Sequence, residues 1–148
     1  MIPVCPQCDR SLMILAYKGI EVDACSQCGG VWFDAGEIED LLERTGVCLE
    51  DPRVAFLTRP SARSVRGKRL CPRCDERMEE HRAPAAAGDA EDLTVDRCPR
   101  GHGVWFDRGE FHRLLARSSP SSGANEALAF LNEMFGEALS SPSSDPKA

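Results

Sequence analysis

Apolar residues along the chain gather in short runs that end at turns or polar segments. Residues 12–17 and 20–24 lie on either side of a short Gly-containing turn and predict a two-stranded hairpin. Residues 78–80 and 93–96 predict a second hairpin. After each hairpin, apolar residues recur at helical spacing, first at Ile38, Leu41 and Leu42 and then at Phe111, Leu114 and Leu115. The pattern therefore predicts two units, each a β-hairpin followed by a short helix.

Each predicted helix begins with the same polar signal. Asp34 is followed three residues later by Glu37, and Asp107 is followed three residues later by Glu110. This spacing is typical of a capping box, in which the first residue caps the helix and the second reaches back to it. Gly46 is expected to end the first helix. Because capping explains both acids of each pair, and no nucleophile or partner base accompanies them, we do not expect an enzyme.

The C-terminal part of the chain shows a different pattern. Residues 118–124 are rich in Ser, Pro and Gly and predict a linker. Within residues 125–139 the apolar side chains fall on one helical face, which predicts an amphipathic helix. We expect this helix to dock on one of the two units, on a partner protein or on a second copy in a homodimer. Residues 140–148 are expected to be disordered.

The chain contains an internal duplication. Cys5-Pro6-Gln7-Cys8 recurs 66 residues later as Cys71-Pro72-Arg73-Cys74, and the run Gly30-Val31-Trp32-Phe33-Asp34 recurs 73 residues later. The difference, 73 − 66 = 7, places a seven-residue insertion between the cysteine pairs of the second copy. Residues 1–50 and 69–117 are therefore predicted as two related units, joined by a basic linker at 51–68.

The size of these units indicates that a metal ion is needed. The chain has 148 residues with 6% aromatics and 8 cysteines, and a unit of about 40 residues seldom buries enough apolar surface to fold alone. No run approaches the roughly 20 apolar residues of a membrane span, and the first residues lack a signal-peptide pattern. We therefore expect a cytoplasmic protein without membrane contact, and in a reducing compartment closely spaced cysteines favour metal ligation. The fold class predicted is small, metal-stabilised α+β.

Eight residues are predicted to hold two ions. In the first copy, two Cys-x2-Cys pairs supply four thiolates to one tetrahedral site, formed by Cys5, Cys8, Cys25 and Cys28. In the second copy Gly101 stands where the fourth cysteine is expected, and the adjacent His102 is predicted to complete a site with Cys71, Cys74 and Cys98. The competing fourth ligands are His81 and His112. Zinc is the expected ion at both sites, and iron, as in a rubredoxin-like electron carrier, is the alternative at the first.

Three further side chains have two interpretations each. Trp32 and Trp105 are expected to pack each helix start against its hairpin, and an exposed aromatic binding surface is the alternative. Cys48 has no counterpart in the repeat and is expected to be a small buried residue rather than a reactive thiol.

The repeated motifs resemble the transcription factor IIB-type zinc-ribbon family. The pattern of that family is Cys-Pro-x-Cys, a short hairpin, and then Cys-x-x-Cys-Gly-Gly-x-Trp-Phe/Leu-Asp-x-Gly-Glu-Leu. The first copy carries this pattern from Cys5 to Glu37, and the second copy departs from it at Gly101. The resemblance covers residues 3–45 and 69–117. It implies tandem zinc ribbons and a role near transcription.

Two function classes follow. The first is a noncatalytic adaptor or regulatory protein that acts through contacts with another protein, because four protein ligands leave a zinc ion no open position for a substrate. The second is nucleic-acid binding through segment 53–73, which holds seven basic residues and no acid although the formal charge of the chain is −6. The candidate contacts are Arg63, Arg66, Lys68 and Arg69. A solvated basic tether is the simpler interpretation of the same segment.

Overall fold

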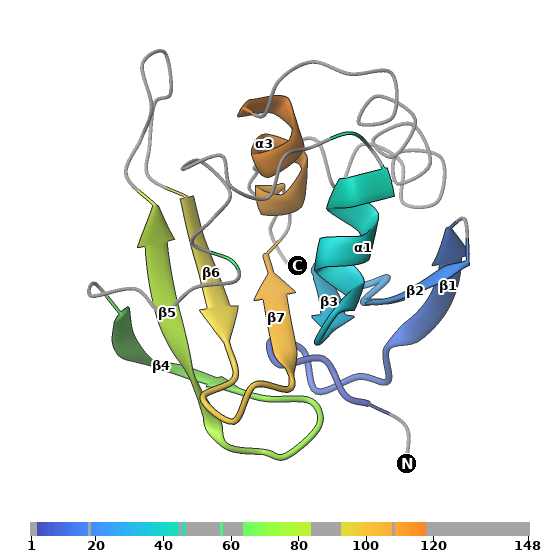
Figure 1. The fold of residues 1–148 in the computed structure, drawn as a ribbon. Coiled ribbons are helices and arrows are strands. Elements are labelled where there is room, and N and C mark those ends of the chain that lie inside the picture. Colours follow the sequence, from blue (N-terminus) through green and yellow to red (C-terminus); the bar gives the residue numbers. More distant parts are fainter. Residues whose placement is uncertain are drawn as a thin grey trace.

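The computed structural model describes residues 3–17, 19–44, 46, 57, 64–83, 93–107 and 109–117. These residues form a seven-stranded antiparallel sheet with two short helices (Figure 1). The predicted helix at 125–139, its linker at 118–124 and the tail at 140–148 lie outside the described residues. No helix in the described part of the chain is long and apolar enough to cross a membrane.

The strands follow the order β1-β2-β3-β7-β6-β5-β4 across the sheet. Their bounds are β1 Met13–Tyr17, β2 Ile20–Ala24, β3 Val31–Asp34, β4 Ser64–Leu70, β5 Arg77–Ala83, β6 Leu93–Arg97 and β7 Gly103–Phe106. The helices are α1 (Glu37–Arg44) and α3 (Glu110–Arg117). Both predicted strand pairs, β1–β2 and β5–β6, and both predicted helices of the repeat are present. We call the cysteine turn before β1, β1–β3 and α1 the first ribbon, and the cysteine turn before β5, β5–β7 and α3 the second ribbon.

The two ribbons join through their third strands. β3 pairs antiparallel with β7, and one of the two central pairs sets Trp32 opposite Trp105. The repeated Val-Trp-Phe run therefore forms a strand in each copy, in addition to the strands that the hydrophobic pattern predicts. Valine and the aromatics suit a pleated, buried surface, so the local composition agrees with this outcome. As a result the sheet is continuous across the two units predicted at 1–50 and 69–117.

The segment predicted as a linker contributes a strand. Residues 64–68 belong to β4, which forms the outer strand next to β5. Arg66 lies opposite Glu79 in this pairing, and a register shift follows between Arg66 and Leu70. A cross-strand pair of opposite charges stabilises antiparallel pairing. The basic residues of β4 are thus part of the sheet, and the linker predicted at 51–68 is wrong for residues 64–68.

The sheet has an apolar layer on each face. On one face, α1 and α3 contribute Ile38, Leu42 and Leu114 to the same buried cluster as the strand residues. Phe33, Phe106 and Phe111 meet there with ring centroids 5.0 to 5.8 Å apart. On the other face, both tryptophans are packed with Leu12, Met78 and the cysteines. The cysteine side of the sheet therefore carries the candidate functional residues.

Candidate metal centres

Four cysteines of the first ribbon converge at one point. Cys5 and Cys8 lie in the turn before β1, and Cys25 and Cys28 lie in the turn between β2 and β3. Their four sulfur atoms all lie within 4.8 Å of one another, and Sγ of Cys5 is 3.7 Å from Sγ of Cys28. A disulfide would bring two sulfurs to about 2.05 Å. The cluster is thus an array of separate thiols.

The spacing of these sulfurs fits a tetrahedral zinc ion. Zinc–sulfur bonds of about 2.3 Å put the corners of a tetrahedron about 3.8 Å apart. The Cys5–Cys28 separation in the first ribbon and the Cys74–Cys98 separation in the second are both 3.7 Å. Each cluster therefore holds donors of the right kind at the right spacing to bind zinc.

Backbone geometry prepares each cysteine turn for a metal ion. The backbone N–H groups of Gln7 and Cys8 point at Sγ of Cys5, with N–S distances of 3.3 and 3.2 Å. Asp9 closes the turn in the left-handed region, at φ 61°, and its repeat partner Asp75 does the same at φ 63°. Donors aimed at a sulfur stabilise the thiolate form that a metal needs.

The second ribbon completes its cluster with His102, as predicted. Nδ1 of His102 lies 3.4 Å from Sγ of Cys98 and 4.0 Å from Sγ of Cys71. Zinc–nitrogen bonds of about 2.0 to 2.1 Å predict a sulfur–nitrogen separation of about 3.6 Å, between these two values. Gly101 has φ 82°, a left-handed conformation that glycine adopts without strain. Its turn comes one residue earlier than that of Gly29 in the first ribbon, which brings the imidazole to the place of the missing thiol.

Of the two competing ligands, His81 lies away from the cluster. His81 lies on β5, is 3% exposed and is not part of the cluster; its Nε2 is 3.5 Å from a Glu79 oxygen. Burial, with the nearby Arg97 charge, lowers the pKa of His81. The side chain of His112, on α3, and the whole of Cys48 lie outside the described residues.

The thiols need a cation to ionise together. Burial, together with the adjacent thiols Cys28 and Cys25, raises the pKa of Cys8 to about 12. Burial likewise raises the pKa of Cys71 to about 12. Several thiolates in one small volume repel each other. A bound divalent cation offsets this repulsion and favours the deprotonated thiolates. The donor set therefore fits zinc, which would supply a structural cross-link between the two turns of each ribbon.

The tryptophans are fully buried, as expected, and do not form an exposed surface. Each one packs over a glycine of the other ribbon. A Cβ atom on Gly30 would lie 2.6 Å from Cη2 of Trp105, and a Cβ atom on Gly103 would lie 2.7 Å from Cζ2 of Trp32. This reciprocal fit explains why glycine precedes Val-Trp-Phe in both copies. It also fixes how closely the ribbons approach.

The predicted capping boxes are half confirmed. Oε1 of Glu37 accepts a 3.1 Å hydrogen bond from the backbone N–H of Asp34, and Glu110 does the same for Asp107. The aspartates use their carboxylates differently, because each accepts a hydrogen bond from the tryptophan two residues earlier, at 2.8 Å for Asp34 and 3.1 Å for Asp107. Burial raises the pKa of Glu37 to about 7 and that of Glu110 to about 8.

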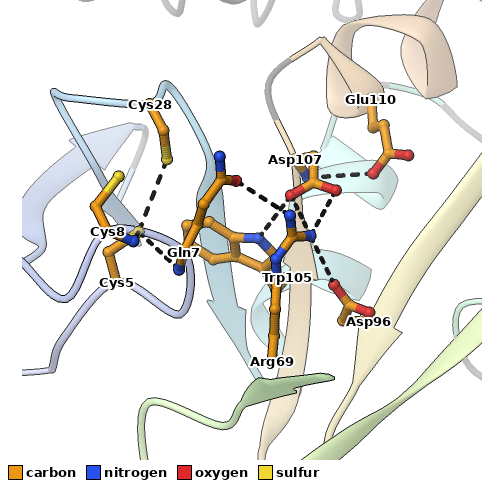
Figure 2. Close-up of polar contacts among 9 residues, drawn as sticks. All are labelled: Cys5, Gln7, Cys8, Cys28, Arg69, Asp96, Trp105, Asp107 and Glu110. Atoms are coloured by element: carbon orange, nitrogen blue, oxygen red, sulfur yellow. Dashed lines mark hydrogen bonds and ion pairs between the residues drawn. The ribbon is translucent and has the colours of Figure 1, made fainter. Parts of the chain in front are cut away.

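Two arginines join the aspartates across the structure. Arg73 donates two 2.7 Å hydrogen bonds to the carboxylate of Asp34 and a 2.8 Å hydrogen bond to Asp23. An arginine of the second ribbon therefore neutralises two aspartates of the first. The matching acids of the second ribbon, Asp96 and Asp107, are contacted by Arg69 of β4 (Figure 2). Two basic residues of the 53–73 segment are therefore neutralised within the chain.

This pairing changes the set of nucleic-acid candidates. Arg69 is engaged with carboxylates, whereas Arg66 and Lys68 are exposed on β4. Arg63 lies outside the described residues. Sequence reasoning missed the arginine–aspartate contacts. Their signal was present, because Asp23 and Asp34 recur as Asp96 and Asp107 at the same offset of 73 as the Trp-Phe run.

Comparison with known families agrees with this geometry. The model of the transcription factor zinc-finger family, a TFIIB-type zinc ribbon, matches residues 4–44 and 70–117. The chain belongs to this family. The two matched segments coincide with the two ribbons and with their cysteine clusters. No curated protein and no solved structure matches the chain.

Proposed function

We propose that this tandem zinc-ribbon protein is a noncatalytic adaptor that binds one zinc ion in each ribbon and acts through contacts with a protein partner. The observation that carries the proposal is that each cluster provides four protein donors within 4.8 Å of one another. Four ligands close the coordination shell of zinc, so the ions would stabilise the fold and leave no position for a substrate. The family name supports an association with transcription.

The outer strands support contact with a protein. Ile14 of β1 is 60% exposed and Val65 of β4 is 58% exposed, and both are large apolar side chains. They lie at opposite edges of the sheet. Apolar residues exposed at strand edges are typical of surfaces that pair with or pack against another chain.

Nucleic-acid binding is less well supported. Phosphate contacts require free cations, and Arg69 and Arg73 are held by aspartates. A filter-binding titration over a salt series tests this point. We expect weak binding that does not change when the exposed Arg66 and Lys68 are replaced by Gln; a steep salt dependence that these changes abolish would favour the nucleic-acid hypothesis.

Metal analysis of the purified full chain tests the proposal itself. We expect two zinc ions per chain, falling to one in His102→Ala, while the control His81→Ala keeps both. One ion in both the parent and His102→Ala would contradict the second site. A coloured protein containing iron would contradict zinc at the first.

A further inference from the structure

The two turns that carry the second metal cluster also contact the start of α1 in the first ribbon. The carbonyl oxygen of His102 accepts a 2.8 Å hydrogen bond from the backbone N–H of Ala35, two residues before α1. The backbone N–H of the neighbouring residue Asp34 donates to the Glu37 carboxylate. The Asp34 carboxylate accepts two 2.7 Å hydrogen bonds from the Arg73 guanidinium. Two contacts therefore reach the same helix start, one from each turn of the second cluster.

Both contacts begin at or beside residues of the second cluster. His102 is itself a member of the cluster. Arg73 lies between Cys71 and Cys74, and its backbone N–H points at Sγ of Cys71 at 3.3 Å. An ion that fixes these thiols would therefore fix the direction of the Arg73 side chain.

Arg73 also contacts a residue close to the first cluster. It binds Asp23, whose carboxylate is almost fully buried, at 2.8 Å. Asp23 lies two residues before Cys25, at the end of β2. Since a buried carboxylate is costly without a cation beside it, loss of Arg73 would disturb the backbone that presents Cys25.

We propose that zinc binding at the second cluster strengthens zinc binding at the first, through the contacts of Arg73 with Asp23 and Asp34. The inference rests on the zinc occupancy proposed above. Coupling between sites is a free energy that acts equally in both directions, and typical values change affinity by about 5- to 150-fold. Because Arg73 and Asp34 are each about one third exposed, we expect a value of about tenfold.

The structure offers a matched control for Arg73. Arg100 lies in the other turn of the same cluster, and its backbone N–H points at Sγ of Cys98 at 3.3 Å. Its side chain, however, bonds Glu76 within the same ribbon at 2.9 Å. Arg73→Gln and Arg100→Gln therefore remove the same charge from the same cluster, and only the first removes a contact between ribbons.

The experiment measures zinc affinity at the first cluster of the full chain by competition with a chromophoric chelator. The second cluster is either intact or disabled by Cys71→Ser and Cys74→Ser. Disabling it should weaken the first site about tenfold in the parent and in Arg100→Gln, and threefold or less in Arg73→Gln. The variants that keep all eight ligands give a second reading, since two-site binding should be cooperative in Arg100→Gln and nearly independent in Arg73→Gln.

The outcomes separate this inference from the proposed function. Fewer than two zinc ions per parent chain would overturn both. Two ions that bind with independent affinities in the parent would overturn the coupling and leave the adaptor proposal intact. Equal coupling in Arg73→Gln and Arg100→Gln would overturn the role assigned to Arg73.

Discussion

The contacts of Arg69 predict a rescue experiment. In the first ribbon, Asp23 and Asp34 form ion pairs with Arg73, which lies in the cysteine turn of the second ribbon. By the symmetry of the repeat, an arginine at position 7 would be expected to contact Asp96 and Asp107. The residue at this position is Gln7, which accepts only a 3.3 Å bond from Arg69 (Figure 2). Arg69 thus does for the second ribbon what an arginine at position 7 would do.

We expect Arg69→Ala to lower the free energy of unfolding by about 2 kcal/mol. Breaking a buried ion pair costs about 3 to 5 kcal/mol, and an exposed one below about 1 kcal/mol. The side chain of Asp96 is 7% exposed, but those of Arg69 and Asp107 are 31% and 35% exposed, so the expected loss lies between these limits. Adding Gln7→Arg to Arg69→Ala should recover about half of the loss, because the new arginine can reach the vacated acids.

The dependence on pH provides an internal check. Burial and the Asp107 charge, opposed by the Arg69 charge, raise the pKa of Asp96 to about 6. When a carboxyl has a higher pKa in the folded protein than in the unfolded chain, the free energy of unfolding falls as the pH rises toward the folded-state pKa. The cost of Arg69→Ala should therefore be larger at pH 8 than at pH 5, where Asp96 takes up a proton.

Urea unfolding at fixed free zinc, followed by tryptophan fluorescence, measures these differences. The control is Lys68→Ala, a change at an exposed position on the same strand, for which we expect less than about 0.5 kcal/mol. The reasoning is refuted if Arg69→Ala costs no more than Lys68→Ala. It is also refuted if Gln7→Arg changes stability equally with and without Arg69, because then the two positions do not share the acids.

Three further changes test other parts of the structure. Gly30→Ala should cost about 1 to 3 kcal/mol of unfolding free energy, because its Cβ overlaps the Trp105 ring; Trp105→Phe should relieve part of this cost, and two additive losses in thermal unfolding would argue against the overlap. Glu110→Gln should gain stability over the parent between pH 5 and 8, by up to about 1.4 kcal/mol per pH unit, because burial raises the pKa of Glu110 to about 8 and the parent loses stability as it ionises; a constant difference between the two urea curves would count against the raised pKa. The parent should lose stability relative to His81→Gln as the pH falls below about 6.5, because the lowered pKa of buried His81 favours its neutral form, and parallel stability profiles over that range would contradict a buried neutral imidazole.

Local patterns were enough to predict the hairpins, the repeat helices and which residues gather in the two clusters of candidate metal ligands. Each depends on residues close together in sequence or on a repeated spacing. His102 could be predicted because it adjoins the position of the missing cysteine, and the structure brings it to the cluster. The placement of Trp32 and Trp105 in the interior followed from their size and apolar surface.

The joining of the ribbons could not be predicted in the same way. Trp32 pairs with Trp105, which lies 73 residues further along the chain. A four-residue run such as Val-Trp-Phe-Asp is too short for its hydrophobic period to distinguish a strand from a packed turn. β4 was missed because its basic residues lack an apolar alternation. Arg69 pairs with Asp96 and Asp107, and Arg66 lies opposite Glu79 in the register, and all three acids are distant in sequence.

Having both ribbons in one polypeptide permits differences that two identical subunits cannot have. In a symmetric homodimer every substitution appears twice, once on each side of the axis. Here position 7 is glutamine while its counterpart is Arg73, and the fourth donor is a thiol on one side and an imidazole on the other. The duplicated chain can thus give its two halves unequal metal affinities and unequal outer surfaces while keeping a shared interior.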